Sequence, residues 1–174
     1  GTPVPGYRVR LVDEAGEEVT AAEEPGELQI SGPSSAVQYW NQPEKSRATF
    51  LEGWTRSGDK YYRNRDGYYV YSGRSDDMLK VSGIYVSPIE VESALIAHEA
   101  VLEAAVVGIE DEEHLIKPKA FVVLKPGYGP GEAMRLELQA HVKGKLAPYK
   151  YPHWIELVED LPKTATGKIQ RYKL

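Results

Sequence analysis

Four short stretches contain the residues that could do chemistry, and two of them hold the best candidates. Asp59 follows Ser57 and Gly58, and a carboxylate on a tight glycine turn can accept hydrogen bonds from the two vicinal hydroxyls of a ribose. The same residues could instead form an Asx-turn between a short helix and a hairpin. Lys168 lies beside a glycine, and a mobile ammonium could neutralise charge developing on a phosphate or carboxylate oxygen. Judged by residue type alone, Lys168 would be a solvent-facing lysine on a terminal loop. The four stretches are GWTRSGD (53–59), GRSDDMLKVSG (73–83), LAPYKYP (146–152) and PKTATGK (162–168).

A second group of candidates lies where the composition of the chain changes. Arg74 carries the fork of N–H groups that suits phosphate or ribose oxygens, and Asp76 and Asp77 follow it. These residues could form a hinge or a solvated loop with weak surface ion pairs. Gly83 interrupts a strand pattern, which indicates either a bulge or the close approach of a backbone or ligand.

Several classes of function are disfavoured by composition. The net charge of −5 argues against non-specific nucleic-acid binding, and no apolar run is long enough to span a membrane. The chain has no cysteine and no secretory leader, so a cytoplasmic location is expected. The four histidines lack metal-ligand spacing, and neither a Ser-His-Asp arrangement nor a glycine-rich phosphate loop is present.

The elements that would position these residues fall into two groups. Residues 1–73 have mainly a β pattern, and residues 77–174 predict a small β-α-β-β-α-β domain, with a hinge at 74–76 between them. The expected elements of the first group are strands at 7–12 and 26–31, a helix over 43–50 capped by Asn41, and a hairpin over 60–71. The second group should comprise a strand at 81–88, a helix capped by Ser87 and running to His98, strands at 101–109 and 120–124, a helix along Met134–Leu146 ended by Pro148, and a strand at 154–159.

Taken together and in this order, the four stretches resemble the C-terminal part of the AMP-forming acyl-CoA synthetase superfamily. That superfamily also contains luciferases and the adenylation domains of peptide synthetases. The resemblance covers essentially the whole chain, and GRSDDMLKVSGIYVSPIEVESAL is most similar to the aryl-CoA ligases. It implies that a carboxylate, here benzoate, is joined to ATP as an acyl-AMP with release of pyrophosphate. The thiol of CoA then displaces AMP.

The resemblance also implies a role for each matching residue. Asp59 matches the aspartate that holds the ribose hydroxyls, and Arg74 matches an arginine that contacts the same nucleotide. Asp76 matches the hinge about which the C-terminal domain rotates between the two half-reactions. Lys168 matches the lysine that enters the site only for adenylation. Because such enzymes are often silenced by acetylation of this lysine, a protein lysine acetyltransferase is an expected partner.

Contacts with CoA are implied at two places. Gly83, with Ser82 beside it, matches the strand that lines the pantetheine tunnel. Tyr149 could stack on adenine and Lys150 could meet a phosphate, although this departs from relatives with several basic residues here. A strand entry packed by aromatic residues would explain Tyr149 equally well.

Some parts of the family pattern are absent from these residues. The Ser/Thr/Gly-rich phosphate loop and the glutamate that helps to hold Mg2+ have no counterpart, so the Mg2+ ligand is expected in a missing N-terminal portion. Because the chain begins at Gly1 in mid-pattern, we expect a fragment that is inactive alone. The expected architecture is α+β: the β-rich end of the large N-terminal domain, followed by a small C-terminal domain with a three-stranded sheet and flanking helices.

Two other functions remain open at this point. One is a different adenylate-forming enzyme, such as a fatty acyl-CoA ligase or a peptide-synthetase adenylation domain. The other is a non-catalytic α+β interaction module that has kept the framework, against which the presence of Asp59, Arg74 and Lys168 in one chain argues.

Overall fold

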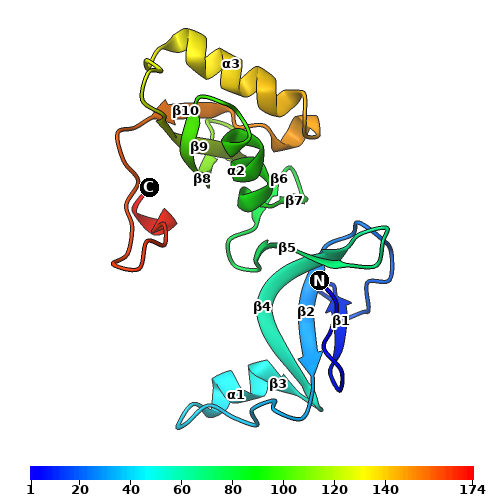
Figure 1. Ribbon diagram of the computed structural model, residues 1–174. Coiled ribbons are helices and arrows are strands. Elements are labelled where there is room, and N and C mark those ends of the chain that lie inside the picture. Colours follow the sequence, from blue (N-terminus) through cyan, green and yellow to red (C-terminus); the bar gives the residue numbers. More distant parts are fainter. The chain divides into compact units, whose positions relative to one another are not determined.

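The polypeptide divides between Asp76 and Asp77 into two units in the computed structural model, which describes residues 1–174 (Figure 1). Unit 1 is Gly1–Asp76 and unit 2 is Asp77–Leu174. The division falls at the last residue of the segment 74–76. No helix in either unit combines the length and the apolar composition needed to cross a bilayer.

Unit 1 is an antiparallel sheet in which β1, β2, β4 and β3 follow one another and β5 pairs with β4. The short helix α1 leads directly into β3. The predicted strands at 7–12 and 26–31 and the hairpin over 60–71 are confirmed. The bounds are β1 Arg8–Val12, β2 Gly26–Ser31, α1 Pro43–Thr49, β3 Phe50–Leu51, β4 Trp54–Arg63 and β5 Tyr69–Arg74.

Two local predictions for unit 1 are wrong. Asn41 does not cap α1, because it has a φ of 52° and the cap residue is Gln42, whose side chain makes no capping hydrogen bond. Asp59 does not lie in a loop, since β4 runs through it without interruption. The turn chemistry of Ser57 and Gly58 produces instead an irregularity within the strand: Gln29 faces Arg56 whereas Glu27 faces Lys60.

Few apolar side chains of unit 1 are buried. Leu11, Val12 and Leu28 are its only buried hydrophobic residues, whereas Val37 and Trp40 are 84% and 90% exposed. The sheet of unit 1 therefore has little core of its own within these residues.

Unit 2 is built on a three-stranded sheet in the order β10-β9-β8, with a separate β6–β7 hairpin. Strands β8 and β9 are antiparallel, and β10 runs parallel to β9. The α+β architecture, with a three-stranded sheet and flanking helices, is confirmed. The bounds are β6 Leu79–Val81, β7 Ile84–Val86, α2 Pro88–Ile96, β8 Val101–Glu110, β9 Ile116–Leu124, α3 Glu132–Lys143, η1 Pro148–Lys150, β10 Trp154–Leu157 and η2 Arg171–Lys173.

Local chemistry explains where the elements of unit 2 begin and end. Ser87 caps α2 as predicted, since its side chain accepts a hydrogen bond from the N–H of Glu90 at 3.3 Å. Helix α3 does not reach Pro148, because Gly144 already forms its C-cap. Strand β9 begins earlier than predicted and includes Pro118. Pro118 lies opposite Gly108 of β8, but its carbonyl accepts the N–H of His153 at 2.8 Å, so its backbone polar groups point away from β8. Proline is tolerated there because β10, on that side, pairs with β9 only from Lys119 onward.

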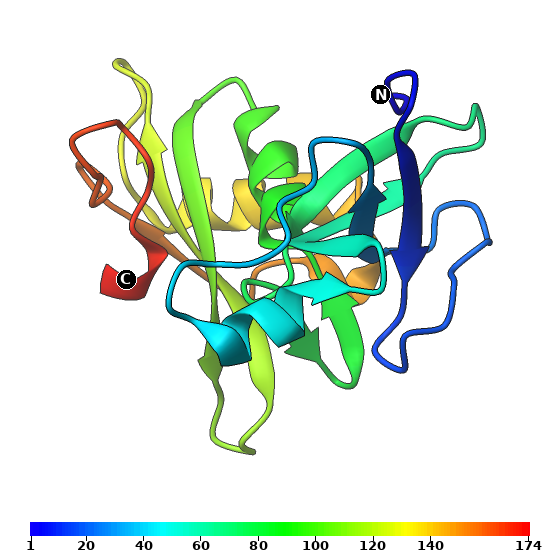
Figure 2. The ribbon, with the colours of Figure 1, turned by 90° about the horizontal axis from the view of Figure 1, so that it is seen from below.

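The two faces of the unit 2 sheet are covered by different parts of the chain (Figures 1 and 2). Alternate residues such as Ala104 and Val122 face α2 and α3 and form the main core. Their neighbours Ala105 and Phe121 face the opposite way, toward the C-terminal tail. The tail is thus a packed layer of unit 2.

Candidate functional site

Asp59, Arg74 and Asp76 lie together at one end of the β4–β5 ladder. Asp59 and Arg74 face each other across the two strands. The Arg74 guanidinium donates from Nη1 to Asp59 Oδ1 at 3.4 Å and from Nε to Asp76 Oδ1 at 3.2 Å. The turn-like contact at this point is made by Ser57, whose Oγ accepts the N–H of Asp59 at 3.1 Å, so the Asx-turn interpretation is wrong. The structure therefore brings together three of the predicted site residues.

The electrostatics of this cluster centre on Arg74. Its pKa is raised, first by the hydrogen bond to Asp76 and next by the charge of that carboxylate. The pKa of Asp76 is lowered, chiefly by the hydrogen bond from Arg74. A Cβ atom at Gly58 would lie 3.3 Å from Arg74 Nη2, so the glycine leaves room for the guanidinium. Because half of the Arg74 side chain is exposed (50%), its remaining N–H groups are accessible to a ligand.

A concave surface of about 520 Å³ adjoins the cluster, which is within the size range of small-molecule sites. The hydroxyl oxygen of Ser75 is buried beside it and has no hydrogen-bond partner. Sequence reasoning missed Lys45, whose ammonium lies 4.5 Å from the centre of the Tyr39 ring, because a lysine in a short helix has no distinctive spacing. The lining residues are Glu27, Tyr39, Lys45, Ala48, Thr49, Arg56, Ser57, Gly58, Arg74, Ser75 and Asp76.

Ser82 and Gly83 form the tip of a hairpin, which corrects both the predicted strand over 81–88 and the predicted bulge. They join β6 to β7 with φ angles of 48° and 84°, as a two-residue turn with both central residues left-handed requires. A Cβ atom at Gly83 would meet no other atom within 4 Å. The glycine is thus favoured by backbone conformation, and the space around it is open to a ligand.

Tyr149 and Lys150 lie in the short helix η1. Both oxygens of Glu90, on α2, accept hydrogen bonds from Lys150 Nζ at 2.7 Å. The Lys150 ammonium also lies 5.9 Å from the centre of the Tyr149 ring, which is on a residue 37% exposed. Tyr149 is therefore accessible, whereas Lys150 is engaged within unit 2.

Lys168 projects from a hydrogen-bonded turn in the tail. Gly167 N–H donates to Thr164 O at 2.9 Å, and Thr164 N–H donates to Lys168 O at 2.8 Å. The Thr164 hydroxyl also accepts the N–H of Lys168 at 3.0 Å. The side chain of Lys168 is exposed, and no hydrogen bond or ion pair holds its ammonium. An ordered backbone thus presents a free positive charge.

The predicted site residues are divided between the units. Asp59, Arg74 and Asp76 belong to unit 1, whereas Ser82, Gly83, Tyr149, Lys150 and Lys168 belong to unit 2. No group of three or more His, Cys, Asp or Glu side chains could hold a metal ion.

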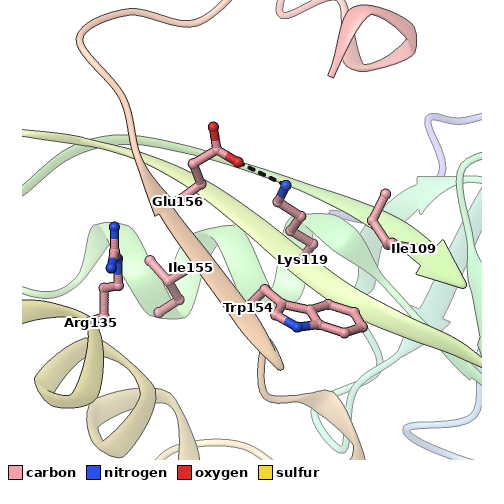
Figure 3. A pocket seen from close by; sticks show the side chains of 6 residues that line it. All are labelled: Ile109, Lys119, Arg135, Trp154, Ile155 and Glu156. Atoms are coloured by element: carbon pink, nitrogen blue, oxygen red, sulfur yellow. Dashed lines mark ion pairs between the residues drawn. The ribbon is translucent and has the colours of Figure 1, made fainter. Parts of the chain in front are cut away.

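Unit 2 also has a concave surface of about 390 Å³ beside β10, shown in Figure 3. Trp154, Lys119 and Arg135 line it, but Lys119 pairs with Glu156 at 2.8 Å and Arg135 pairs with Glu132 at 3.1 Å. None of the predicted site residues lies there. Both cations on this surface are paired with carboxylates of unit 2.

Comparison with known proteins connects this geometry to a family. The family model for the AMP-binding enzyme C-terminal domain matches residues 90–168. This segment is therefore similar to the C-terminal domain of AMP-binding enzymes. The match begins in α2 at Glu90 and ends at Lys168, and all the unit 2 candidates except Ser82 and Gly83 lie inside it.

Proteins similar to this chain include ligases of aromatic acids. It is 79% identical over all 174 residues to the benzoate–CoA ligase of Thauera aromatica. The crystal structure of a benzoate CoA ligase from Burkholderia xenovorans LB400 matches 99% of the chain with a TM-score of 0.90 and 62% identity. That of the anthranilate CoA ligase AuaEII in complex with anthranoyl-AMP matches 99% with a TM-score of 0.91 and 54% identity. The chain spans about a third of these proteins: 33%, 34% and 33% of their lengths, respectively.

Proposed function

We propose that these residues are the C-terminal part of an AMP-forming aryl-CoA ligase that acts on benzoate. The observation that carries the proposal is the likeness of the whole chain to benzoate–CoA ligases. The complete protein would join benzoate to ATP, releasing pyrophosphate and forming benzoyl-AMP. The sulfur of CoA would then attack the acyl carbon, giving benzoyl-CoA and AMP.

In the first half-reaction, the residues of this chain would bind the nucleotide and balance its charge. Asp59 would accept hydrogen bonds from the ribose hydroxyls, and Arg74 would donate to the same nucleotide. The cluster geometry supports this, because Arg74 donates to Asp59 and itself lines a cavity of suitable size. Lys168 would place its ammonium on a phosphate oxygen as negative charge develops there. A free ammonium on an ordered turn suits that task.

Between the half-reactions, Asp76 would act as the hinge. Residues 1–73 would be the last β-rich piece of the N-terminal adenylation domain, 74–76 the hinge, and 77–174 a mobile C-terminal domain. The division of the chain after Asp76 supports this assignment. Rotation about this point would withdraw Lys168 so that CoA could enter.

In the second half-reaction, Ser82 and Gly83 would line the path of the pantetheine arm. The open space around Gly83 supports this role. Tyr149 would stack on the adenine of CoA. Lys150 would bind a CoA phosphate only by exchanging its pair with Glu90 for that contact, because both are made by the same ammonium.

Several further proposals concern the complete protein. Mg2+ would accompany ATP, with its protein ligands outside these residues. The exposed ammonium of Lys168 would be the target of a protein lysine acetyltransferase, and acetylation would remove the charge that adenylation needs. We place the enzyme in the cytoplasm, in the degradation of aromatic compounds.

The test is Lys168→Ala in the complete protein, with the two half-reactions measured separately. Benzoate-dependent exchange of pyrophosphate into ATP should fall by orders of magnitude, since the removable charge is lost. Thioester formation from supplied benzoyl-AMP and CoA should persist. If both half-reactions keep their rates, a non-catalytic role for this domain gains support. If CoA fails to bind the complete protein, a carrier-dependent adenylating enzyme fits better.

A further inference from the structure

The C-terminal tail is held to the body of unit 2 by apolar packing before any charge is considered. Leu161 is 2% exposed and packs with Ala105 and Phe121 on the sheet face opposite α2 and α3. Ile169, on the far side of the Lys168 turn, packs against the same cluster. The bridge between Lys163 and Ile169 closes the base of the turn.

Each leg of the Lys168 turn also carries a cation that reaches a different element. On the incoming leg, Lys163 Nζ lies 2.7 Å from Glu103 of β8 and 3.0 Å from Asp160. On the outgoing leg, Arg171 Nε donates to Glu92 Oε1 at 3.0 Å, and its Nη2 donates to Glu92 Oε2 at 2.7 Å. The Lys168 turn is therefore tied to the sheet on one side and to helix α2 on the other.

The Arg171–Glu92 pair differs from a surface ion pair because the carboxylate is buried. The Glu92 side chain is 9% exposed and that of Arg171 is 26% exposed. Glu92 Oε1 also accepts the N–H of Val106 at 2.9 Å, at the unpaired edge of β8. Moving Arg171 away would leave this buried charge without its cation, which is far more costly than losing an exposed pair.

Arg171 also contacts the start of unit 2. Its Nη1 lies 3.6 Å from Asp77 Oδ2, and Asp77 is the first residue after the proposed hinge. Arg171, in the tail three residues after Lys168, thus contacts both helix α2 and the residue next to the proposed hinge.

We propose that Arg171 is a positioning residue for adenylation: its pair with Glu92 fixes the Lys168 turn to unit 2, so that rotation of the unit delivers the Lys168 ammonium to one place. This rests on the proposed function. Arg171 itself contacts no substrate. Without the pair, the apolar contacts still hold the tail, but the turn loses its link to α2 and to Asp77.

The experiment uses the complete protein with Arg171→Gln, Arg171→Lys and Glu92→Gln, and with Arg135→Gln as a matched control. Arg135 also pairs with a glutamate but lies on α3, and its pair is exposed. Arg171→Gln should lower the turnover of benzoate-dependent pyrophosphate exchange by about tenfold to a hundredfold, as expected for a displaced charge. The KM for ATP and the rate of thioester formation from benzoyl-AMP should stay near wild type. Arg171→Lys should restore part of the turnover, and Arg135→Gln should change neither half-reaction.

Amide hydrogen exchange in the same proteins provides a second measurement. Exchange in residues 163–171 should accelerate in Arg171→Gln and Glu92→Gln and not in Arg135→Gln. If Arg171→Gln does not fold, Arg171→Lys and Glu92→Gln test the proposal instead. At least one of them must then slow adenylation without slowing thioester formation. Unchanged adenylation in the folded variants, or an equal loss of both half-reactions, would overturn the proposal.

Lys168→Ala, measured in parallel, separates failure of this proposal from failure of the proposed function. If Lys168→Ala separates the half-reactions and the Arg171 variants do not, only the positioning role is wrong. If Lys168→Ala leaves adenylation intact, the proposed function itself fails.

Discussion

At the scale of single residues, Gly83 at the tip of the β6–β7 hairpin could be required for its backbone conformation or for the space that it leaves to a ligand. Gly83 has a left-handed φ of 84°, yet a side chain there would meet no other atom of the chain. Asparagine tolerates this backbone conformation better than other residues with a side chain. The backbone requirement and the space requirement can therefore be tested independently.

We expect Gly83→Asn to cost about 1 kcal/mol of stability or less, because the left-handed conformation remains accessible. In the complete protein it should slow thioester formation from benzoyl-AMP much more than pyrophosphate exchange, since the new side chain would enter the proposed pantetheine path. The rate of each half-reaction, measured separately, and the free energy of unfolding in urea give these effects. Gly127→Asn provides the control, because Gly127 also has a left-handed φ (96°) and open space around it but lies outside the proposed CoA path. Equal rates in Gly83→Asn and wild type would remove Gly83 from the CoA path.

Residue types made Asp59, Arg74, Asp76 and Lys168 candidates, and the family resemblance implied their roles. Neither predicted the contacts that these side chains make. The pairing of Asp59 with Arg74 depends on the β4–β5 ladder, and a strand containing Ser57 and Gly58 looks locally like a turn. The Arg171–Glu92 pair joins residues 79 positions apart, so no local pattern indicates it. The Ser82–Gly83 turn could have been predicted, because serine followed by glycine between short apolar runs is a hairpin signal.

At the scale of elements, the contact between α2 and α3 contains a histidine whose surroundings favour its neutral form. His141 Nε2 donates to Ala94 O at 3.1 Å, and the His98 ring lies edge-on at 4.8 Å between ring centres. The pKa of His141 is lowered from 6.5, first by burial and next by the charge of Lys145. The Glu137 carboxylate lies 3.3 Å from His98 Nε2, and it makes no ion pair with His141.

The stability of unit 2 should therefore depend on pH below about 6.5, the ordinary histidine pKa. Since the folded pKa of His141 lies below the unfolded one, the unfolded chain binds the proton first as the pH falls. The free energy of unfolding should decrease through that window. His141→Gln keeps a donor for Ala94 O and should reduce this dependence. Urea unfolding of the wild type and of His141→Gln at pH 7.5 and pH 5 checks this prediction. An equal change in the free energy of unfolding in both proteins would contradict it.

Element boundaries were predictable where a capping residue decides them and not where a competing signal lies nearby. Ser87 and Pro88 start α2 as their types require. Pro148 looked like the end of α3, but Gly144 ends it one turn earlier. The first residues of β9 were not predicted, because Pro118 lies among them and a proline usually argues against a strand. Pro118 is tolerated only because β10 begins to pair with β9 after it.

At the scale of the whole molecule, the two units differ in what stabilises them. Unit 2 has a continuous apolar core between its sheet and helices, with a second cluster under the tail. Unit 1 buries only Leu11, Val12 and Leu28 and exposes Trp40. Unit 2 thus has the interior of a domain, whereas unit 1 is mainly a sheet with few buried apolar side chains.

Residues 1–174 purified alone should form no benzoyl-AMP from benzoate and ATP. In the proposed function Asp59, Arg74 and Lys168 would hold the nucleotide and balance its charge. The 174 residues contain no glycine-rich phosphate loop and no group of three or more possible metal ligands to complete that site. A coupled pyrophosphate assay, with the complete protein as the positive control, measures this. Benzoyl-AMP detected above the protein-free background would refute the prediction.

The buried Glu92 carboxylate has a consequence for how copies of this protein behave in a crowded solution. Strand β8 is a sheet edge, and exposed edge N–H groups invite pairing with a strand from another chain. Glu92 occupies one such group, at Val106, and Arg171 covers the carboxylate from outside. A charged pair thus blocks the edge at its middle. The same contact that anchors the tail thus also removes one N–H group from those that the edge of β8 could offer to another strand.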